Sequence, residues 1–444
     1  MIKNLFARIK RRNKYKVVKG KSKKGTNSIF SFNRNIKDIK CKKFKWKNTI
    51  IYFLFLIVCF YIIVIGVVSI YKFAKLSFKR AYRDDEKELT EWRAEDRLNI
   101  LLVGIDKREG EFGYIDAVQI LVIDPIDKSV GIFNINPDVS VYISNIRKYT
   151  EIRNVYNQGV LESKEIPIYL LTKSVENLVS VKIHRYIILD EDSMIKLTEL
   201  IGGIYVNNPY DVKDKDVVLK NGEFKLEKGN FRLRSDQFLA YLRTDDDSID
   251  NKLNRQIIGT EGLLKKLTSY SIFLKSIKIL ENISDILTTN LSKNEIVRLL
   301  LVISKCGEIK SSFMGGNTIQ SNGENFLPIY DILDKEIQKV FADKSVGKEQ
   351  ARVEVFNSTD IKGLANFRAR WLRNIGIDVI RIGDAAQAFD KTTVYTREED
   401  KYNDTLNSIK RSFGEEIEIR DGEMPDWFCT GDVIIILGNN IKIE

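Results

Sequence analysis

The feature that most constrains this chain is an uncharged apolar run near its N-terminus. The run from Thr49 to Tyr71 reads TIIYFLFLIVCFYIIVIGVVSIY, 23 residues without a charged side chain. As a helix rising 1.5 Å per residue, it is long enough to cross a hydrocarbon core of about 30 Å. A cleavable signal peptide has a shorter apolar core followed by a small-residue cleavage site, and a buried core helix normally interleaves polar residues. We therefore expect a transmembrane helix over 49–71.

The distribution of charge predicts how that helix is oriented. Residues 1–48 hold 18 Lys and Arg and one acid, Asp38, a net charge of +17, whereas the other 396 residues carry 54 basic and 60 acidic side chains, a net charge of −6. Export of so basic a tail is unfavourable, so we expect a single-pass protein of the plasma membrane, with a cytoplasmic N-terminus and extracellular main domains. The tail can also attract anionic lipid head groups. Binding of nucleic acid is the alternative, but no reading motif accompanies the charge, so no nucleic acid partner is expected.

The histidine and cysteine content restricts the possible chemistry. The chain has one histidine, His184, and four cysteines too far apart for a CxxC pair. These numbers exclude zinc ribbons, thioredoxin-type redox motifs and His-rich metal centres. A serine or cysteine triad would have to include His184, which lies at a predicted helix-to-strand join and is interpreted as a structural imidazole. The chemistry must therefore rest on Asp, Glu, Arg, Lys or Tyr.

Strand and helix patterns alternate after a charged stalk and indicate an α/β fold. The first unit has predicted strands at 98–103, 117–124 and 130–135, helices at 166–179, 192–201 and 236–242, and amphipathic stretches at 255–283 and 293–306. A second, smaller α/β unit begins near Gln350. Its predicted strands are 351–356, 377–382, 392–395, 416–419 and 433–437, and its helices are 363–373 and 400–413.

The order of motifs resembles that of the LytR-CpsA-Psr family. After the basic tail and the span, the chain carries NILLVGIDKREG from Asn99, INPD from Ile135, GGIYV from Gly202, LRSDQFLAYLR from Leu233 and NRQ from Asn254. The segment after Gln350, with VFNSTDIKGLA and a terminal VIIILGNN, resembles the LytR C-terminal domain that often follows the family's extracellular domain.

The resemblance implies an α-β-α sandwich with an apolar lipid pocket, preceded by one transmembrane helix and followed by a small α/β domain. The expected segments are a basic cytoplasmic tail at 1–48, the transmembrane helix at 49–71, a charged stalk at 72–97, the extracellular family domain at 98–342, and the C-terminal domain at 350–444. It also implies an activity: a Mg²⁺-dependent phosphotransferase that moves a glycopolymer from a polyprenyl pyrophosphate carrier to a peptidoglycan acceptor, a step of cell wall assembly. Such chemistry needs positioning and neutralisation of phosphate oxygens, which carboxylate-bound metal and guanidinium groups supply without histidine.

The resemblance also assigns site residues. It implies that Asp116 and Asp138 bind the metal. It makes Asp138, Arg243 and Arg255 catalytic. Gln256 and Lys252 are expected at the substrate, Lys252 standing where the family has an arginine. Arg108, Arg153 and Arg234 are candidate replacements for arginines that this chain lacks.

Three family arginines are absent, because their positions hold Tyr114, Pro137 and Asp245. Each lost charge-assisted contact is worth about 1.5–3 kcal/mol unless another group replaces it. Two functions therefore stay open. The chain is either a working glycopolymer phosphotransferase with a rearranged basic shell, or a relative that binds polyprenyl-linked lipids or regulates envelope assembly without turnover.

Overall fold

The computed structural model describes residues 46–81, 90–106, 113–143, 147–158, 167–219, 222–245, 248–273, 275–323, 325–413, 417–427 and 429–441. Most of the basic tail and part of the charged stalk lie outside the described residues, so nothing here tests what was predicted for them. The chain divides into two compact units, 1–61 and 62–444.

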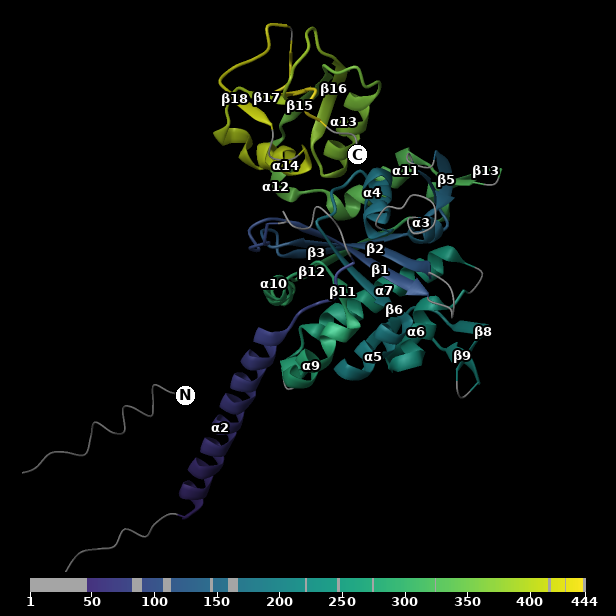
Figure 1. Ribbon diagram of the computed structural model, residues 1–444, viewed down its shortest axis with the longest axis vertical. Helices are drawn as coiled ribbons and strands as arrows, with labels where there is room; N and C mark the ends of the chain where they lie inside the picture. Colours follow the sequence, from purple (N-terminus) through teal and green to yellow (C-terminus); the bar gives the residue numbers. More distant parts are fainter. Residues whose placement is uncertain are drawn as a thin grey trace, which may run out of the picture. The chain divides into compact units, whose positions relative to one another are not determined.

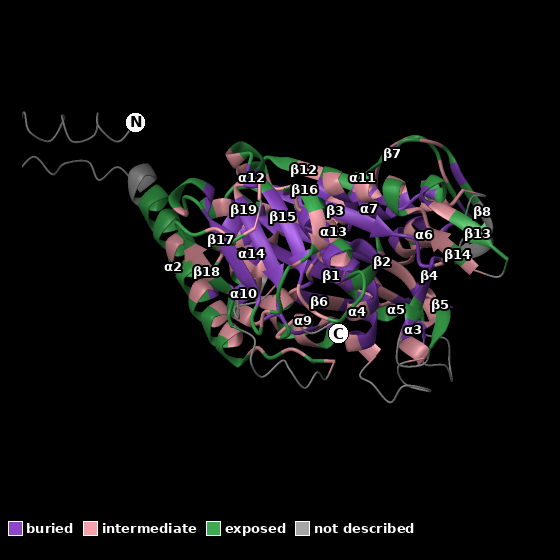
Figure 2. Cartoon of the chain, turned by 90° about the horizontal axis from the view of Figure 1, so that it is seen from above, coloured by how far each residue is buried: buried purple, intermediate pink, exposed green. Residues whose placement is uncertain are grey.

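The apolar run forms helix α2, Trp46–Lys75. Among the described residues it is the one helix long and apolar enough to cross a membrane. Its most apolar 18-residue window has a mean hydropathy of 3.1 and is only 6% buried. Figure 2 shows the described part of α2 as mostly exposed, with some intermediate residues, in contrast to the buried strands. That exposure argues against the alternative of a core helix.

A six-stranded sheet forms the centre of the larger α/β region. Its order is β11-β6-β1-β2-β3-β12, in which β1, β2 and β3 form an antiparallel meander, β6 runs parallel to β1, and β12 runs parallel to β3. The strands are β1 (Leu98–Asp106), β2 (Tyr114–Asp124), β3 (Ser129–Ile135), β6 (Arg185–Asp190), β11 (Thr288–Thr289) and β12 (Glu308–Phe313). Three of them match the predicted strands closely.

Helices cover both faces of this sheet, as Figure 1 shows. On one face lie α3 (Ile152–Gln158), α4 (Pro167–Val179) and α11 (Tyr330–Phe341); on the other lie α5 (Glu191–Ile201), α6 (Ser235–Arg243), α7 (Ile249–Leu267), α8 (Tyr270–Phe273), α9 (Ser276–Ile286) and α10 (Lys293–Ile303). Because side chains alternate along a strand, β1 sends Leu101 and Val103 to the first face and Ile100 and Leu102 to the second. The predicted α-β-α sandwich is confirmed.

Small two-stranded sheets accompany the central sheet of the sandwich. They pair β4 (Ser140–Ile143) with β5 (Lys148–Glu151), β7 (Ile204–Asn208) with β10 (Gly229–Leu233), β8 (Val212–Leu219) with β9 (Gly222–Leu226), and β13 (Ile319–Asn322) with β14 (Asn325–Pro328).

The amphipathic stretch predicted over 255–283 is not one helix. It is split into α7, α8 and α9, and the first break, between α7 and α8, falls at Thr268 and Ser269. The Thr268 hydroxyl donates to the carbonyl of Leu264 and the Ser269 hydroxyl to that of Lys266. Such local bonds compete with continuation of a helix, which explains the break.

The second α/β region has its own sheet and core. The sheet order is β16-β15-β19-β17-β18, built from β15 (Arg352–Asn357), β16 (Asp378–Asp384), β17 (Thr393–Thr396), β18 (Glu418–Asp421) and β19 (Val433–Leu437), with α12 (Lys344–Glu349), α13 (Leu364–Asn374) and α14 (Asn403–Phe413). The elements predicted here are confirmed to within a few residues, because β-branched runs and Gly363 and Gly376 mark their limits. The domain boundaries proposed from the sequence stay predictions.

Arg370 on α13 joins the two α/β regions. Its guanidinium donates to the Asp334 carboxylate of α11 at 2.6 and 2.9 Å, to the Ser180 hydroxyl at 2.8 Å and to the Leu178 carbonyl at 2.8 Å. Its side chain is only 18% exposed and that of Asp334 only 21%. Little water therefore competes for these bonds.

We expect Arg370→Ala to lower the free energy of unfolding by about 2–3 kcal/mol, because it leaves a mostly buried carboxylate without its cation. Urea denaturation measures this. Arg352→Ala is the matched control, since Arg352 also pairs with an aspartate, Asp432, but is 53% exposed. Equal losses in the two variants would contradict a joining role for Arg370.

His184 is a structural imidazole, as predicted. The backbone N–H of Asn99 donates to its Nδ1 at 2.9 Å, and the His184 N–H donates to the Asn99 carbonyl. Burial lowers the pKa of His184 to about 3, with further lowering from the positive charges of Arg185, Lys182 and Arg411. The ring is therefore neutral at physiological pH.

Because the unfolded chain protonates His184 near pH 6.5, this residue favours folding above that pH, and its contribution is lost as pH falls from 6.5 toward 3. We expect the imidazole NMR resonances, which belong to the only histidine in the chain, to stay constant between pH 8 and pH 5. A titration midpoint near 6.5 would show that the ring is exposed.

Candidate functional site

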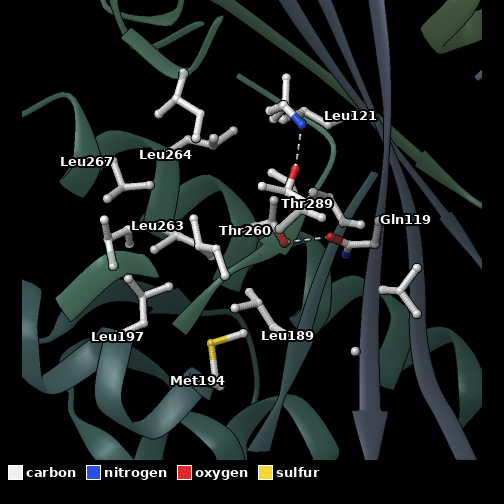
Figure 3. Close-up of a pocket in the computed structure, with 18 of the residues that line it drawn as sticks. Gln119, Leu121, Leu189, Met194, Leu197, Thr260, Leu263, Leu264, Leu267 and Thr289 are labelled. Atoms are coloured by element: carbon white, nitrogen blue, oxygen red, sulfur yellow. Dashed lines mark hydrogen bonds between the residues drawn. The ribbon is translucent and has the colours of Figure 1, made fainter. Parts of the chain in front are cut away.

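An apolar pocket lies between the sheet and the helices α5, α6, α7, α9 and α10. Its volume is about 330 Å³. Figure 3 shows its aliphatic lining, including Leu121, Leu189, Leu197, Leu263, Leu264 and Leu267. The Thr260 hydroxyl donates to Gln119 Oε1 at 2.6 Å, so these two polar side chains partly satisfy each other within the pocket. Such a surface suits a hydrocarbon ligand.

A β-bulge turns Asp116 toward this pocket. Gly104 pairs with Ala117 and Ile105 with Ile115, so Asp116 is the extra residue on β2. Strict alternation would send Asp116 to the opposite face, with Val118 and Ile120. Instead Ile115 is fully buried on that face and Asp116 lines the pocket.

Arg243 brings three carboxylates together at the charged side of the pocket. Its NH2 lies 2.7 Å from Asp106 Oδ2, its Nε lies 3.9 Å from Asp116 Oδ2, and its NH1 donates to Glu191 Oε1. Lys252 Nζ adds a second cation, 3.0 Å from Asp116 Oδ1. Three anionic groups and two cationic groups therefore share one small, partly buried space.

Element ends position these groups. Asp106 ends β1, Glu191 begins α5, and Arg243 ends α6. The Asp190 side chain accepts from the Ser193 N–H as the N-cap of α5, which fixes the start of that helix beside the C-terminal end of β1. Carboxyl ends of parallel strands thus bring the acids to one edge of the sheet.

The pKa of Glu191 is raised, first by burial and then by its hydrogen bond with Asp106 and the charges of Asp106 and Asp116, whereas the charge of Arg243 opposes the rise. Crowded carboxylates favour the protonated form of one member. Glu191 is therefore the group at this site that is best suited to hold a proton.

Arg255 lies behind the pocket and holds the end of α6. It is completely buried, and its guanidinium donates to the carbonyls of Tyr241 and Thr244 and to the Tyr210 hydroxyl. These bonds orient the turn that follows Arg243. The geometry gives Arg255 a positioning role, and its predicted catalytic role stays untested.

The structure gathers some predicted residues and separates others. Asp116, Arg243 and Gln256 line the pocket, and Lys252 contacts Asp116. Gln256 accepts from Asn134 at 2.9 Å.

Asp138 instead forms an ion pair with Arg153 of α3, and no described cation pairs with both Asp138 and Asp116. The register of β2 and β3 still places both aspartates at the same edge of the sheet. Arg108 lies outside the described residues.

The three non-arginine positions lie around the same edge. Tyr114 begins β2 opposite Asp106 and is 39% exposed. The buried Pro137 presents its carbonyl to the Arg153 N–H at 2.9 Å. Asp245 is exposed just after α6. No guanidinium group stands at any of these positions.

Sequence reasoning missed two acids at the pocket, Asp106 and Glu191. Asp106 ends the LLVGID run. A prediction that this run pairs antiparallel with the strand beginning near Asp116 would have placed Asp106 close to Asp116. Glu191 follows Asp190 at a helix start, where acids are common for reasons of capping and helix dipole alone. Only the parallel pairing of β6 with β1, which is not visible in the sequence, identifies it.

Family models match most of the chain. A model of the LytR_cpsA_psr family matches residues 64–344, and a model described as LytR cell envelope-related transcriptional attenuator matches residues 350–440.

Individual relatives are distant. The chain is 25% identical over 271 residues to the polyisoprenyl-teichoic acid–peptidoglycan teichoic acid transferase TagU of Oceanobacillus iheyensis. The aligned region covers 58% of this chain and 78% of the relative. It is 26% identical over 215 residues to TagV of Bacillus subtilis, a transferase of the same description, covering 46% of this chain and 53% of that relative. The crystal structure of B. subtilis TagV superposes with a TM-score of 0.45 at 21% identity, covering 64% of this chain and 99% of that one. A structure of TagT bound to LI-WTA gives 0.44 at 18% identity, covering 60% and 99%.

We expect two substitutions to move the pKa of Glu191 in opposite directions. Asp106→Asn removes a hydrogen-bond partner and a negative charge that raise it, so the pKa falls; Arg243→Gln removes an opposing positive charge, so the pKa rises. Carbon-13 NMR of labelled glutamate carboxyls measures both without divalent cation, with Glu191→Gln to assign the signal. Shifts of the same sign would contradict the geometry.

Proposed function

Because the chain belongs to the LytR-CpsA-Psr family, we propose that it transfers a glycopolymer from a polyprenyl pyrophosphate carrier to peptidoglycan. The observation that carries this proposal is an apolar pocket with a cluster of charged groups along one side. The relatives TagU and TagV are named as transferases of polyisoprenyl-linked teichoic acid to peptidoglycan. Cell wall assembly is the process in which such a reaction takes part.

The two parts of the site suit the two parts of such a donor. Hydrophobic burial draws the isoprenoid chain into the pocket, and the pyrophosphate then lies at Arg243 and Lys252. Arg243 can engage phosphate oxygens with two N–H groups, whereas Lys252 supplies a point charge. Arg153 is a further cation at the same edge of the sheet.

The residues at the pocket also fit a divalent cation such as Mg²⁺. Asp106, Asp116 and Glu191 offer hard oxygen ligands, and their three potential negative charges exceed the two positive charges of Arg243 and Lys252. We propose that Asp106 and Asp116 hold the cation, which when bound would neutralise charge on the phosphate oxygens. Asp138 is the other proposed ligand, and in the structure its carboxylate forms an ion pair with Arg153.

Glu191 suits the role of proton acceptor. In the proposed reaction an acceptor hydroxyl oxygen forms a bond with the phosphorus that carries the glycan. The bond from that phosphorus to the bridging oxygen breaks, and polyprenyl phosphate leaves. The hydroxyl proton passes to a Glu191 carboxylate oxygen, whose raised pKa favours taking it up.

The proposed location follows from α2 and the charge distribution. We propose a single-pass plasma membrane protein with the N-terminus in the cytoplasm and residues 72–444 outside, where peptidoglycan is accessible.

The alternative is a relative that binds polyprenyl-linked lipid, or regulates envelope assembly, without turnover. Its support is the missing guanidinium groups at Tyr114, Pro137 and Asp245, which leave fewer contacts for a transition state. One experiment separates the two functions.

We expect the full chain in nanodiscs, given a polyprenyl pyrophosphate-linked glycan, a peptidoglycan acceptor and Mg²⁺, to release polyprenyl phosphate. Arg243→Lys should lower the rate by about 10–100-fold by removing a two-bond contact, and Asp116→Ala and chelation of the metal should abolish it. Thin-layer chromatography of the labelled lipid measures release. Arg352→Lys, in the C-terminal sheet, is the control.

Asp138→Ala tests the remaining predicted metal ligand, since a loss as large as that of Asp116→Ala would support it. Lipid binding with no release in any condition would favour the non-catalytic alternative. No binding of the lipid would overturn both functions.

A further inference from the structure

The end of the membrane-spanning helix forms part of the lipid pocket. Phe73, Leu76 and Phe78, from the last turn of α2 and the residues after it, line the pocket together with Ile296 and Leu300 of α10. All three are half-buried, whereas the intervening Ala74, Lys75 and Ser77 are exposed. We call residues 73–78 the strap.

Contacts from both ends hold the strap against the pocket. Lys72 forms an ion pair with Glu281 of α9 at 3.1 Å. Lys293 of α10 donates to the Ala74 carbonyl at 2.9 Å and lies 5.5 Å from the Phe73 ring centre.

After the strap, the Lys79 carbonyl accepts from the Thr289 N–H at 2.9 Å, so the chain adds to the β11 edge of the sheet. The Ala81 carbonyl then accepts from the Tyr186 hydroxyl at 2.6 Å. Figure 1 shows the upper end of α2 beside α9 and α10.

We propose that the strap is the bilayer side of the pocket, and that an isoprenoid chain passes along it directly from the membrane without crossing water. This inference rests on the proposed function. The uncharged run ends at Tyr71, so residues 72–78 follow the hydrocarbon core and reach the polar interface. A wall built from those residues must open near the acyl chains.

The surface around the strap has the chemistry of a membrane-facing surface. Val297 and Leu301 on α10 are large apolar side chains exposed by 42% and 55%. The exposed Lys278 of α9 lies one helical turn from Glu281, the partner of Lys72, so its charge is suited to a phosphate head group.

The width of the sheet separates the strap from Asp116. The strap joins the β11 edge, whereas Asp116 is on β2, three strands away, or about 14 Å at the usual strand spacing. A short isoprenoid can therefore bind beside Arg243 without reaching the strap. This separation makes entry and binding distinguishable by experiment.

The test compares entry from a membrane with binding from solution. The full chain is reconstituted in vesicles of phosphatidylglycerol and phosphatidylcholine that contain a photoactivatable polyprenyl phosphate, and cross-linking is followed over time. Binding of geranyl diphosphate from solution is measured by calorimetry. Leu76→Arg places a charge on the strap, and Leu301→Arg places the same charge on a neighbouring exposed position that does not line the pocket.

We expect Leu76→Arg to slow cross-linking at least about tenfold, with geranyl diphosphate affinity unchanged, because a charge in the apolar path is costly. Leu301→Arg should match the unchanged chain. Equal cross-linking rates for Leu76→Arg and the unchanged chain would overturn the inference.

Two further outcomes are informative. If Leu76→Arg does not fold, Leu76→Gln and Phe78→Gln replace it, with the same expected slowing. If the unchanged chain binds neither geranyl diphosphate nor the polyprenyl lipid, the proposed function fails rather than the entry path alone.

Discussion

The shared contacts of the Arg243 guanidinium organise this site. Three carboxylates from β1, β2 and α5 would repel one another in a partly buried space, and one planar cation at the end of α6 lies among them. The arrangement depends on two details of the backbone, the bulge that turns Asp116 to the pocket face and the buried Arg255 that holds the turn after Arg243. Remote buried residues thus position the groups that would meet a substrate.

The last turn of α2 and the residues after it form part of the pocket lining. The apolar run continues into residues that line the pocket, and the sheet whose β11 edge receives that segment carries Asp116 three strands away on β2. A lipid-linked substrate has the same two-part character, with a long apolar chain and a charged head. The architecture therefore matches the ligand in the order in which its parts would arrive from a bilayer.

Much of the fold was predictable, because strands such as 130–135 and 433–437 are unbroken β-branched runs and helices such as 192–201 have clear caps and periodicity. The site was less predictable. The order of motifs was enough to predict Asp116 and Arg243 as site residues. The position of Glu191 depends on the parallel pairing of β6 with β1, a long-range contact that no local sequence pattern encodes. Arg255 resembled a ligand-binding arginine in sequence, and only its complete burial shows that it holds backbone carbonyls. The break at Thr268 depended on hydroxyl-to-carbonyl bonds that periodicity does not register.

The charge balance bears on the absent arginines. Asp106, Asp116 and Glu191 face two cations, so the described site has no spare positive charge for a pyrophosphate unless protons or metal ions are added. Uptake of the acceptor's proton by Glu191 would remove one negative charge during the proposed reaction, and its raised pKa favours that step. A divalent cation held by Asp106 and Asp116, as proposed, would supply further positive charge. Tyr114 and Asp245 stand where guanidinium groups would otherwise lie. In the proposed reaction, turnover should therefore depend on a bound metal more strongly than in a site with a full arginine set.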